Sequence, residues 1–159
     1  MTKHYALDRT DRQILTLLAK DARLSNKDLA TLVDLSPSAC WERVRTLRET
    51  GALRGEHADV DPGAFAIGVQ ALVAIRLRQH SREFVNDFRA HALKLPEVIA
   101  LYHVAGKLDF LVHVCARDPD HLKDFALDAF TTRREVASIE TSLIFEFVRN
   151  PELPDYGED

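Results

Sequence analysis

The sequence predicts an α+β protein with two domains, in which three short helices precede a strand–helix–strand–strand–helix–strand domain. Apolar residues recur at helical spacing through the N-terminal third of the chain, whereas the later part alternates period-2 and period-3.6 segments. The turn-forming sequence Asp61-Pro62-Gly63 separates the two parts. We therefore expect a first domain over residues 1–60, a hinge over 61–68, a second domain over 69–149 and a tail over 150–159.

The first domain is expected to contain three helices. The first covers residues 7–21, and the second begins at Ser25, whose hydroxyl can cap the unpaired amides. The third runs from a cap at Ser36 to Gly51, which suits the left-handed conformation that ends many helices. Residues 52–60 are predicted to form a strand, so this domain is expected to be winged-helix-like.

Very few residues separate the second and third helices, which is typical of a helix-turn-helix. In that motif the third helix enters the major groove, where exposed side chains meet bases and flanking arginines meet phosphates. Its buried face would carry Cys40, Val44 and Leu47. Ser38, Glu42 and Arg45 would then face base edges, and Arg43, Arg48 and Arg54 would meet phosphates. With Ser36 and Ala39 at the start of the helix, these are the candidate DNA-binding residues. The pattern alone leaves open a plain three-helix bundle with a solvated charged face.

The charge is unevenly distributed. The net charge is −4, but residues 1–60 hold ten Lys/Arg and nine Asp/Glu, so the later part is the acidic one. Affinity for DNA must therefore come from locally clustered arginines. Trp41 either packs on the first helix, the interpretation we favour, or stacks on a nucleotide sugar. The opening residues lack an apolar run and the two cysteines lie far apart, so we expect a cytoplasmic protein with no signal peptide.

The second domain is predicted from alternating strand and helix patterns. The expected strands are 69–78, 98–105, 108–117 and 136–148, and the expected helices begin at Ser81 and at Asp118-Pro119. This order resembles the ferredoxin-like split βαβ arrangement. Both faces of the strands look apolar, although helices can cover only one of them. An open apolar face is a liability in a monomer, so we expect a homo-oligomer, most simply a two-fold dimer.

The whole chain resembles the Lrp/AsnC family of regulators. The resemblance rests on Leu7–Leu15, Asp21–Ser25 and Leu35–Gly51, and on Gly106-Lys107-Leu108-Asp109-Phe110, which is similar to the Gly-x-x-Asp-Tyr turn of the family's sensing domain. It implies a sequence-specific DNA-binding transcription regulator of amino-acid metabolism genes. It also implies dimers that assemble further, commonly into octamers, and that bind amino acids or related metabolites between dimers.

The resemblance also implies where an effector would bind. The candidate effector-binding residues are Tyr102, Gly106, Asp109, Ile139 and Thr141. Asp109 would either bond the turn amides or meet an amino group, and Gly106 would supply a bare backbone for a carboxylate. The chain departs from the family at Thr132–Val136, where Leu-Pro-Gly-Val is common, and at Ile139-Glu140-Thr141, where Thr-x-Thr is common.

Two other classes of function are compatible with parts of the sequence. A small ferredoxin-like dimeric enzyme is disfavoured, because no nucleophile with its base and orienting group is apparent and the first 60 residues would have no purpose. An architectural regulator that binds DNA without an effector is the second alternative. The seven histidines show no metal-binding spacing, so we expect neither a metal site nor a cofactor.

Overall fold

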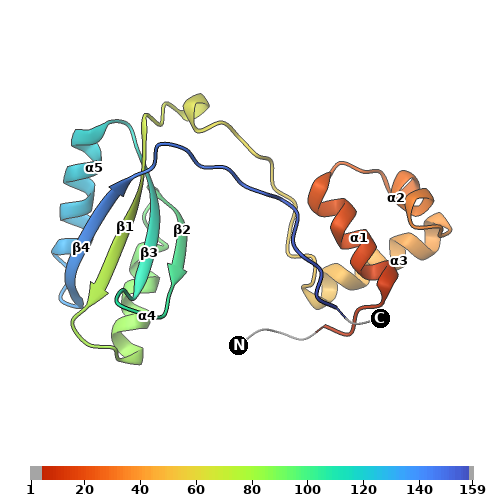
Figure 1. Cartoon of the computed structure of the whole chain (residues 1–159), viewed down its shortest axis with the longest axis horizontal. Helices are drawn as coiled ribbons and strands as arrows, with labels where there is room; N and C mark the ends of the chain where they lie inside the picture. The colour runs from red at the N-terminus through yellow and green to blue at the C-terminus, as the bar shows by residue number, and fades with distance from the viewer. Residues whose placement is uncertain (1–4, 158–159) are drawn as a thin grey trace. The chain divides into compact units, whose positions relative to one another are not determined.

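The computed structural model describes residues 5–157, which form two compact units (Figure 1). One unit combines the chain before Val60 with the chain after Phe147, and the other comprises Val60–Phe147. Each unit has its own hydrophobic core. The C-terminal segment therefore belongs to the same unit as the N-terminal helices.

Three helices make up most of the first unit. They are α1 (Arg9–Lys20), α2 (Asn26–Leu32) and α3 (Pro37–Thr50). The predicted caps Ser25 and Ser36 each accept a hydrogen bond from a first-turn amide, and Gly51 ends α3 with φ 79°. The first helix begins two residues later than expected, because Asp8 is its N-cap and forms a reciprocal capping box with Asp11.

The predicted strand over residues 52–60 is wrong. Leu53 still donates its amide to the carbonyl of Leu47, and the segment then runs without strand pairing. A strand needs a neighbour that satisfies its amides and carbonyls, and the described part of this unit contains no such neighbour. The segment expected to be the hinge contains the 3₁₀ turn η1 (Pro62–Phe65), which is capped by Asp61.

The second unit is an antiparallel four-stranded sheet with two helices, which confirms the ferredoxin-like prediction. Its elements are β1 (Val69–Leu77), α4 (Arg82–Ala92), β2 (Val98–His103), β3 (Phe110–Ala116), α5 (Pro119–Ala126), the π-helical turn η2 (Leu127–Thr131) and β4 (Val136–Leu143). The strand order is β2-β3-β1-β4. The last strand ends earlier than predicted because its partner β1 begins at Val69, and the final bond runs from the Ile144 amide to the Gln70 carbonyl.

Helices α4 and α5 cover one face of the sheet. Phe88 of α4 contacts Phe110 of β3 and Phe130 of η2, with ring centroids 4.9 and 5.8 Å apart. All three rings are fully buried, and they pack with Val73 and Ile75 of β1. Phe110 of this aromatic centre is the first residue of β3 and directly follows Asp109, one of the candidate effector-binding residues.

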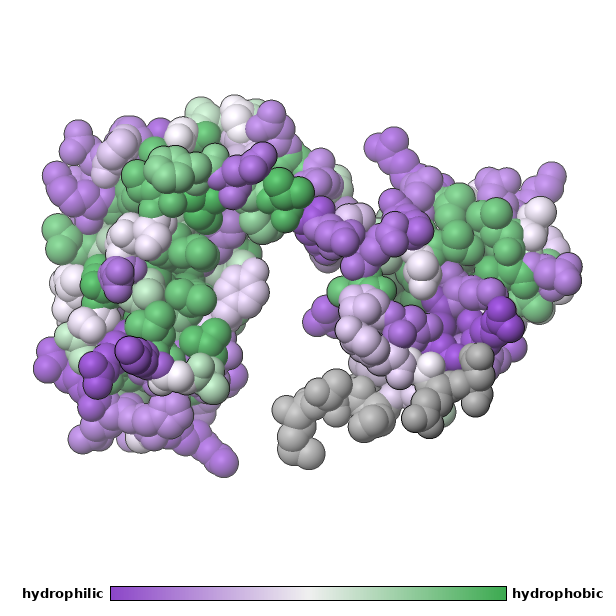
Figure 2. Space-filling view, viewed as in Figure 1, coloured by the Kyte–Doolittle hydropathy of each residue, from purple (hydrophilic) through white to green (hydrophobic). Residues whose placement is uncertain are grey.

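The other face of the sheet has no helix over it and is apolar along three strands. The cross-strand register places Leu72 and Ala74 of β1 beside His113 and Leu111 of β3 on this face. Figure 2 shows the exposed surface over this sheet as largely hydrophobic. At the β4 edge the same face is polar, with residues Ser138, Glu140 and Ser142. The predicted apolar face is therefore confirmed for β1, β2 and β3 but not for β4.

Candidate nucleic-acid interface and candidate effector site

The helix α3 is held by one apolar stripe and leaves the opposite stripe in solvent. Cys40, Val44 and Leu47 are buried in the core of the first unit. The side-chain amide of Asn26 donates to the Pro37 carbonyl over 2.7 Å, which ties the start of α2 to the start of α3. The predicted base-contacting residues Ser38, Glu42 and Arg45 are exposed, and so are the candidates Ser36 and Ala39 at the start of the helix.

Two arginines on the exposed side of α3 and at its end already have carboxylate partners. Arg45 contacts Glu42 one turn before it and lies 3.9 Å from Glu49 one turn after it. Arg48 contacts Glu56 at 2.6 Å. Such exposed ion pairs contribute little to stability, so phosphate or base contacts can replace them easily. The Glu42 and Glu49 pairings follow from i,i+3 and i,i+4 spacing, so sequence reasoning could have anticipated them.

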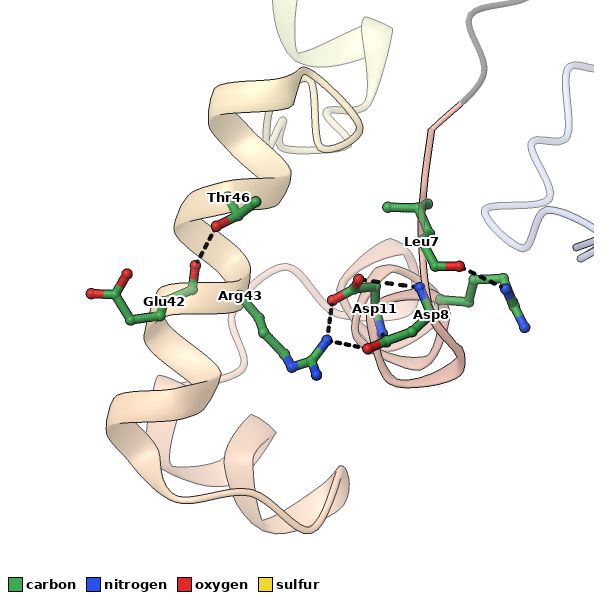
Figure 3. A network of polar contacts seen from close by, with 7 residues as sticks. Leu7, Asp8, Asp11, Glu42, Arg43 and Thr46 are labelled. Carbon is green, nitrogen blue, oxygen red and sulfur yellow. Dashed lines mark hydrogen bonds and ion pairs between the residues drawn. The ribbon is translucent and has the colours of Figure 1, made fainter. Parts of the chain in front are cut away.

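Arg43 faces the opposite way and links two helices. Its guanidinium contacts Asp8 at 2.6 Å and Asp11 at 2.8 Å, at the N-terminus of α1 (Figure 3). The pKa of Asp8 is lowered, first by the hydrogen bond from the Asp11 amide and then by Arg43, and the two carboxylates raise the pKa of Arg43. Nothing in the sequence revealed this contact, because it joins residues 32 and 35 positions apart.

Trp41 also differs from the favoured interpretation. Its side chain is 52% exposed, and the guanidinium of Arg45 lies 5.4 Å from the centre of its ring. It is therefore a surface residue of α3 rather than part of the packing against α1. Cys40 and Cys115 are buried, and burial raises the pKa of both thiols, so neither is a reactive thiolate at neutral pH.

The turn between β2 and β3 holds Gly106 and Asp109, two of the predicted effector-binding residues. Gly106 has φ 133°, which favours glycine, and the space where a side chain would begin is open. Asp109 is nearly buried and accepts a hydrogen bond from the Leu77 amide at 2.7 Å. Its other carboxylate oxygen lies 2.7 Å from Nδ1 of His80, a residue that the sequence analysis did not single out.

The other predicted effector-binding residues lie apart from one another. Tyr102 stands on β2, opposite Leu111, on the face without helices. Ile139 and Thr141 stand on β4, opposite Ile75 and Val73, on the helix-covered face. Strands β2 and β4 form the two edges of the sheet, so one chain does not bring Tyr102 and Thr141 together.

The segment before β4 holds a buried charge that the sequence analysis missed. Glu135 is fully buried, and Arg133 contacts one of its carboxylate oxygens at 2.7 Å. The second oxygen has no partner among the described residues. This pair occupies the same segment in which the sequence departs from the pattern of the resembled family.

The part of the chain that the structure describes, residues 5–157, has neither a membrane-spanning helix nor a cluster of metal-binding side chains. No helix there is long and apolar enough to cross a membrane. No cluster of three or more histidine, cysteine, aspartate and glutamate side chains in that part of the chain is arranged to hold a metal ion.

Family models match both units. A winged helix-turn-helix DNA-binding model matches residues 7–54, and the Lrp/AsnC ligand-binding domain matches residues 70–152. The chain belongs to the Lrp/AsnC family. It is thus a DNA-binding transcription regulator with a ligand-binding domain, and its named relatives are regulators rather than enzymes.

Similar Lrp/AsnC proteins cover almost the whole chain. The regulator AldR of Mycolicibacterium smegmatis is 42% identical over 90% of this chain and 84% of its own length. The activator DecR of Escherichia coli is 31% identical over 90% of this chain and 94% of its own length. The crystal structure of regulator NMB0573 of Neisseria meningitidis, in complex with L-Met, superposes with TM-score 0.84 and 29% identity, covering 94% of this chain and 97% of that one.

Proposed function

We propose that this Lrp/AsnC regulator controls amino-acid metabolism genes in response to an amino acid or a related metabolite. The observation that carries the proposal is the ligand-binding domain over residues 70–152, together with the L-Met complex of a relative that spans nearly the same length. Residues 1–60 would bind DNA, 61–68 would act as the hinge, and 69–149 would sense the effector and associate. Because its partner is DNA, we place the protein in the cytoplasm.

The exposed candidate DNA-binding residues fall into two groups, those that face bases and those that contact phosphates. We propose that Ser38, Glu42 and Arg45 face base edges, that Ser36 and Ala39 lie beside them at the DNA, and that Arg48 and Arg54 contact phosphates. All of these residues are exposed. Arg43 was assigned to a phosphate by its place in the sequence, but its two carboxylate partners favour a role in positioning α3.

We propose that the regulator is a homo-oligomer of dimers, up to an octamer. The support is the helix-free sheet face, where Ala74 pairs with Leu111 and Leu72 lies on the same face of β1. Burial of such a face against a second copy removes apolar surface from water at about 25 cal/mol per Å². Light scattering at micromolar concentration is expected to give an even multiple of the 18.0 kDa chain, and a stable monomer would contradict it.

The experiment that tests the proposed function is a thermal-shift screen of the amino acids, followed by DNA-binding titrations with any compound that binds. A ligand at 100 times its dissociation constant adds about 2.7 kcal/mol of stability. Arg45→Ala should cost about 1–3 kcal/mol at the operator and relax discrimination at one base pair per half-site. Specific DNA binding that no metabolite changes would favour the effector-independent regulator.

A further inference from the structure

Trp41 lies within the stripe of α3 that carries the predicted base-contacting residues. Ser38, Glu42 and Arg45 occupy positions i, i+4 and i+7 of this helix. Trp41 occupies position i+3, which completes the spacing of one helix face. Its side chain is 52% exposed, so the core of the first unit does not account for it. The indole is therefore open to a molecule that contacts this stripe.

Trp41 also contacts the arginine that is proposed to read a base. A single exposed apolar side chain is ordinary on a protein surface, so exposure alone indicates no role. The guanidinium of Arg45, however, lies over the Trp41 ring, 5.4 Å from its centre, which is within the range of a cation–π interaction. Arg45 also donates from Nη2 to Glu42, and its Nε lies 3.9 Å from Glu49. Three side chains of the same helix thus surround this guanidinium.

Of these three neighbours, the tryptophan is the one that can support Arg45 while it reads a base. An arginine recognises guanine by donating two N–H groups to O6 and N7. The carboxylates of Glu42 and Glu49 compete for those N–H groups, so a base has to displace them. Stacking on an indole uses the flat face of the guanidinium and leaves its N–H edge free. The contact with Trp41 can therefore persist when Arg45 is bound to guanine.

The same contact brings the indole to the neighbouring base pair. Bidentate bonding places the guanidinium in the plane of the guanine, and successive base pairs are about 3.4 Å apart. A ring that lies over the guanidinium is then at the level of the next base pair. The apolar group that base pairs present in the major groove is the 5-methyl group of thymine. An exposed indole at this level suits thymine.

We propose that Trp41 is a further specificity-determining residue, which positions Arg45 for a guanine and contacts the 5-methyl group of a thymine in the adjacent base pair. Trp41 acts on the guanine only through Arg45, and on the thymine directly. The inference rests on the proposed function, in which Arg45 faces a base edge. It adds that each half-site contains a thymine beside the guanine.

The first test measures the preference for guanine, with the duplex that the wild-type full chain selects from a random-sequence pool. The base pair read by Arg45 is the one at which Arg45→Ala loses discrimination. Replacement of its G·C by A·T should weaken the wild type, and Trp41→Ala should reduce that penalty about fivefold. Trp41→Phe should keep the penalty within about twofold of the wild type, because a phenyl ring also stacks on a guanidinium. Each penalty is a ratio of two affinities of one protein preparation, so partial unfolding of a variant does not change it.

The second test removes the thymine methyl group alone. Uracil in place of the adjacent thymine should weaken the wild type about fourfold, the size expected for the loss of one buried apolar carbon, and should leave Trp41→Ala unchanged. The matched control is Leu32→Ala on α2, because Leu32 is 59% exposed but lies outside the stripe. This control should keep the wild-type guanine preference and the wild-type uracil penalty.

The outcomes separate the inference from the proposed function. An unchanged guanine preference in Trp41→Ala would overturn the positioning of Arg45, and a uracil penalty that persists in this variant would overturn the thymine contact. Stacking on a sugar would weaken all duplexes equally, and cover by a second copy would change the assembly, so either result without a change in both ratios would overturn the inference. If Arg45→Ala keeps full discrimination at every base pair, the proposed base contact fails, and the inference fails with it.

Discussion

Removal of the Arg43 guanidinium should destabilise the helix-turn-helix unit more than removal of any other arginine charge on α3. Arg43→Ala breaks two contacts, at 2.6 Å to Asp8 and at 2.8 Å to Asp11, which join α3 to the first turn of α1 (Figure 3). The two carboxylates also lie where the helix dipole favours negative charge, and they remain there without their counter-ion.

The size of the stability loss in Arg43→Ala depends on how exposed the side chains of this ion pair are. Fully exposed ion pairs contribute about 0–1 kcal/mol, whereas hydrogen bonds to charged groups contribute about 1.5–3 kcal/mol. The Asp11 side chain is 16% exposed and that of Arg43 is 35% exposed, so this pair falls between these cases. We expect a loss of about 1–2 kcal/mol, which lowers the melting temperature of a 60-residue domain by roughly 4–16 °C.

The assay is thermal and urea unfolding followed by circular dichroism, with Arg45→Ala as the control. Arg45 pairs within its own helix, so its loss should change stability by less than about 0.5 kcal/mol. The pKa of Asp8 is lower in the folded protein than in the unfolded chain. The contribution of Asp8 to the free energy of unfolding is therefore complete at pH values above its pKa in the unfolded chain. It is lost as the pH falls through its pKa in the folded protein. The Arg43→Ala effect should therefore shrink below about pH 4.

DNA binding provides the result that would refute this reasoning. A phosphate contact predicts that Arg43→Ala lowers the salt slope of binding by about one for all sequences. A positioning role predicts a reduced stability and an unchanged slope. An unchanged melting temperature together with a reduced slope would show that Arg43 contacts DNA and does not hold α3.

Three further predictions concern other residues of the two units. Trp41, the one tryptophan in the sequence, is half-exposed on α3, so operator DNA should shift or quench its fluorescence; unchanged emission at saturation would exclude contact. Burial lowers the pKa of His113, and the unfolded chain then binds more protons, so the second unit should lose stability as pH falls below about 6.5. His113→Leu should flatten that profile in urea unfolding, and an identical slope would contradict it. Asp155 contacts Arg12 of α1 at 3.1 Å, so Asp155→Asn should cost up to about 1 kcal/mol at low salt and less at high salt in calorimetry; a salt-independent loss would exclude the ion pair.

Local chemistry in the sequence was enough to predict most of the fold. Ser25, Ser36 and Gly51 mark helix ends through hydrogen bonds and backbone conformations that involve only a few neighbouring residues. The alternation in β1 and β3 predicted two strands, and the observed register places those residues on two faces. The strand prediction for residues 52–60 was wrong because a strand needs a neighbouring strand to pair with. No local feature of the sequence shows whether such a neighbour exists.

The candidate sites were less accessible to sequence reasoning because their contacts are long-range. Arg43 looked like a phosphate ligand by its position on the helix, and its partners Asp8 and Asp11 come from a different helix. His80 went unnoticed because Asp109 lies 29 positions later in the chain. The Gly106–Asp109 turn itself was recognisable, since a glycine with positive φ and an aspartate in a short turn are local features.

The sheet order explains why effector binding should be coupled to assembly. Tyr102 on β2 and Thr141 on β4 occupy opposite edges and opposite faces, and three strand spacings amount to about 14 Å. A ligand the size of an amino acid cannot touch both in one chain, so these residues can serve one site only if different copies supply them. Such a ligand favours the assembled state by mass action. Sedimentation with effector present should show a larger assembly at lower protein concentration, and binding that is independent of protein concentration would place the site within a single chain.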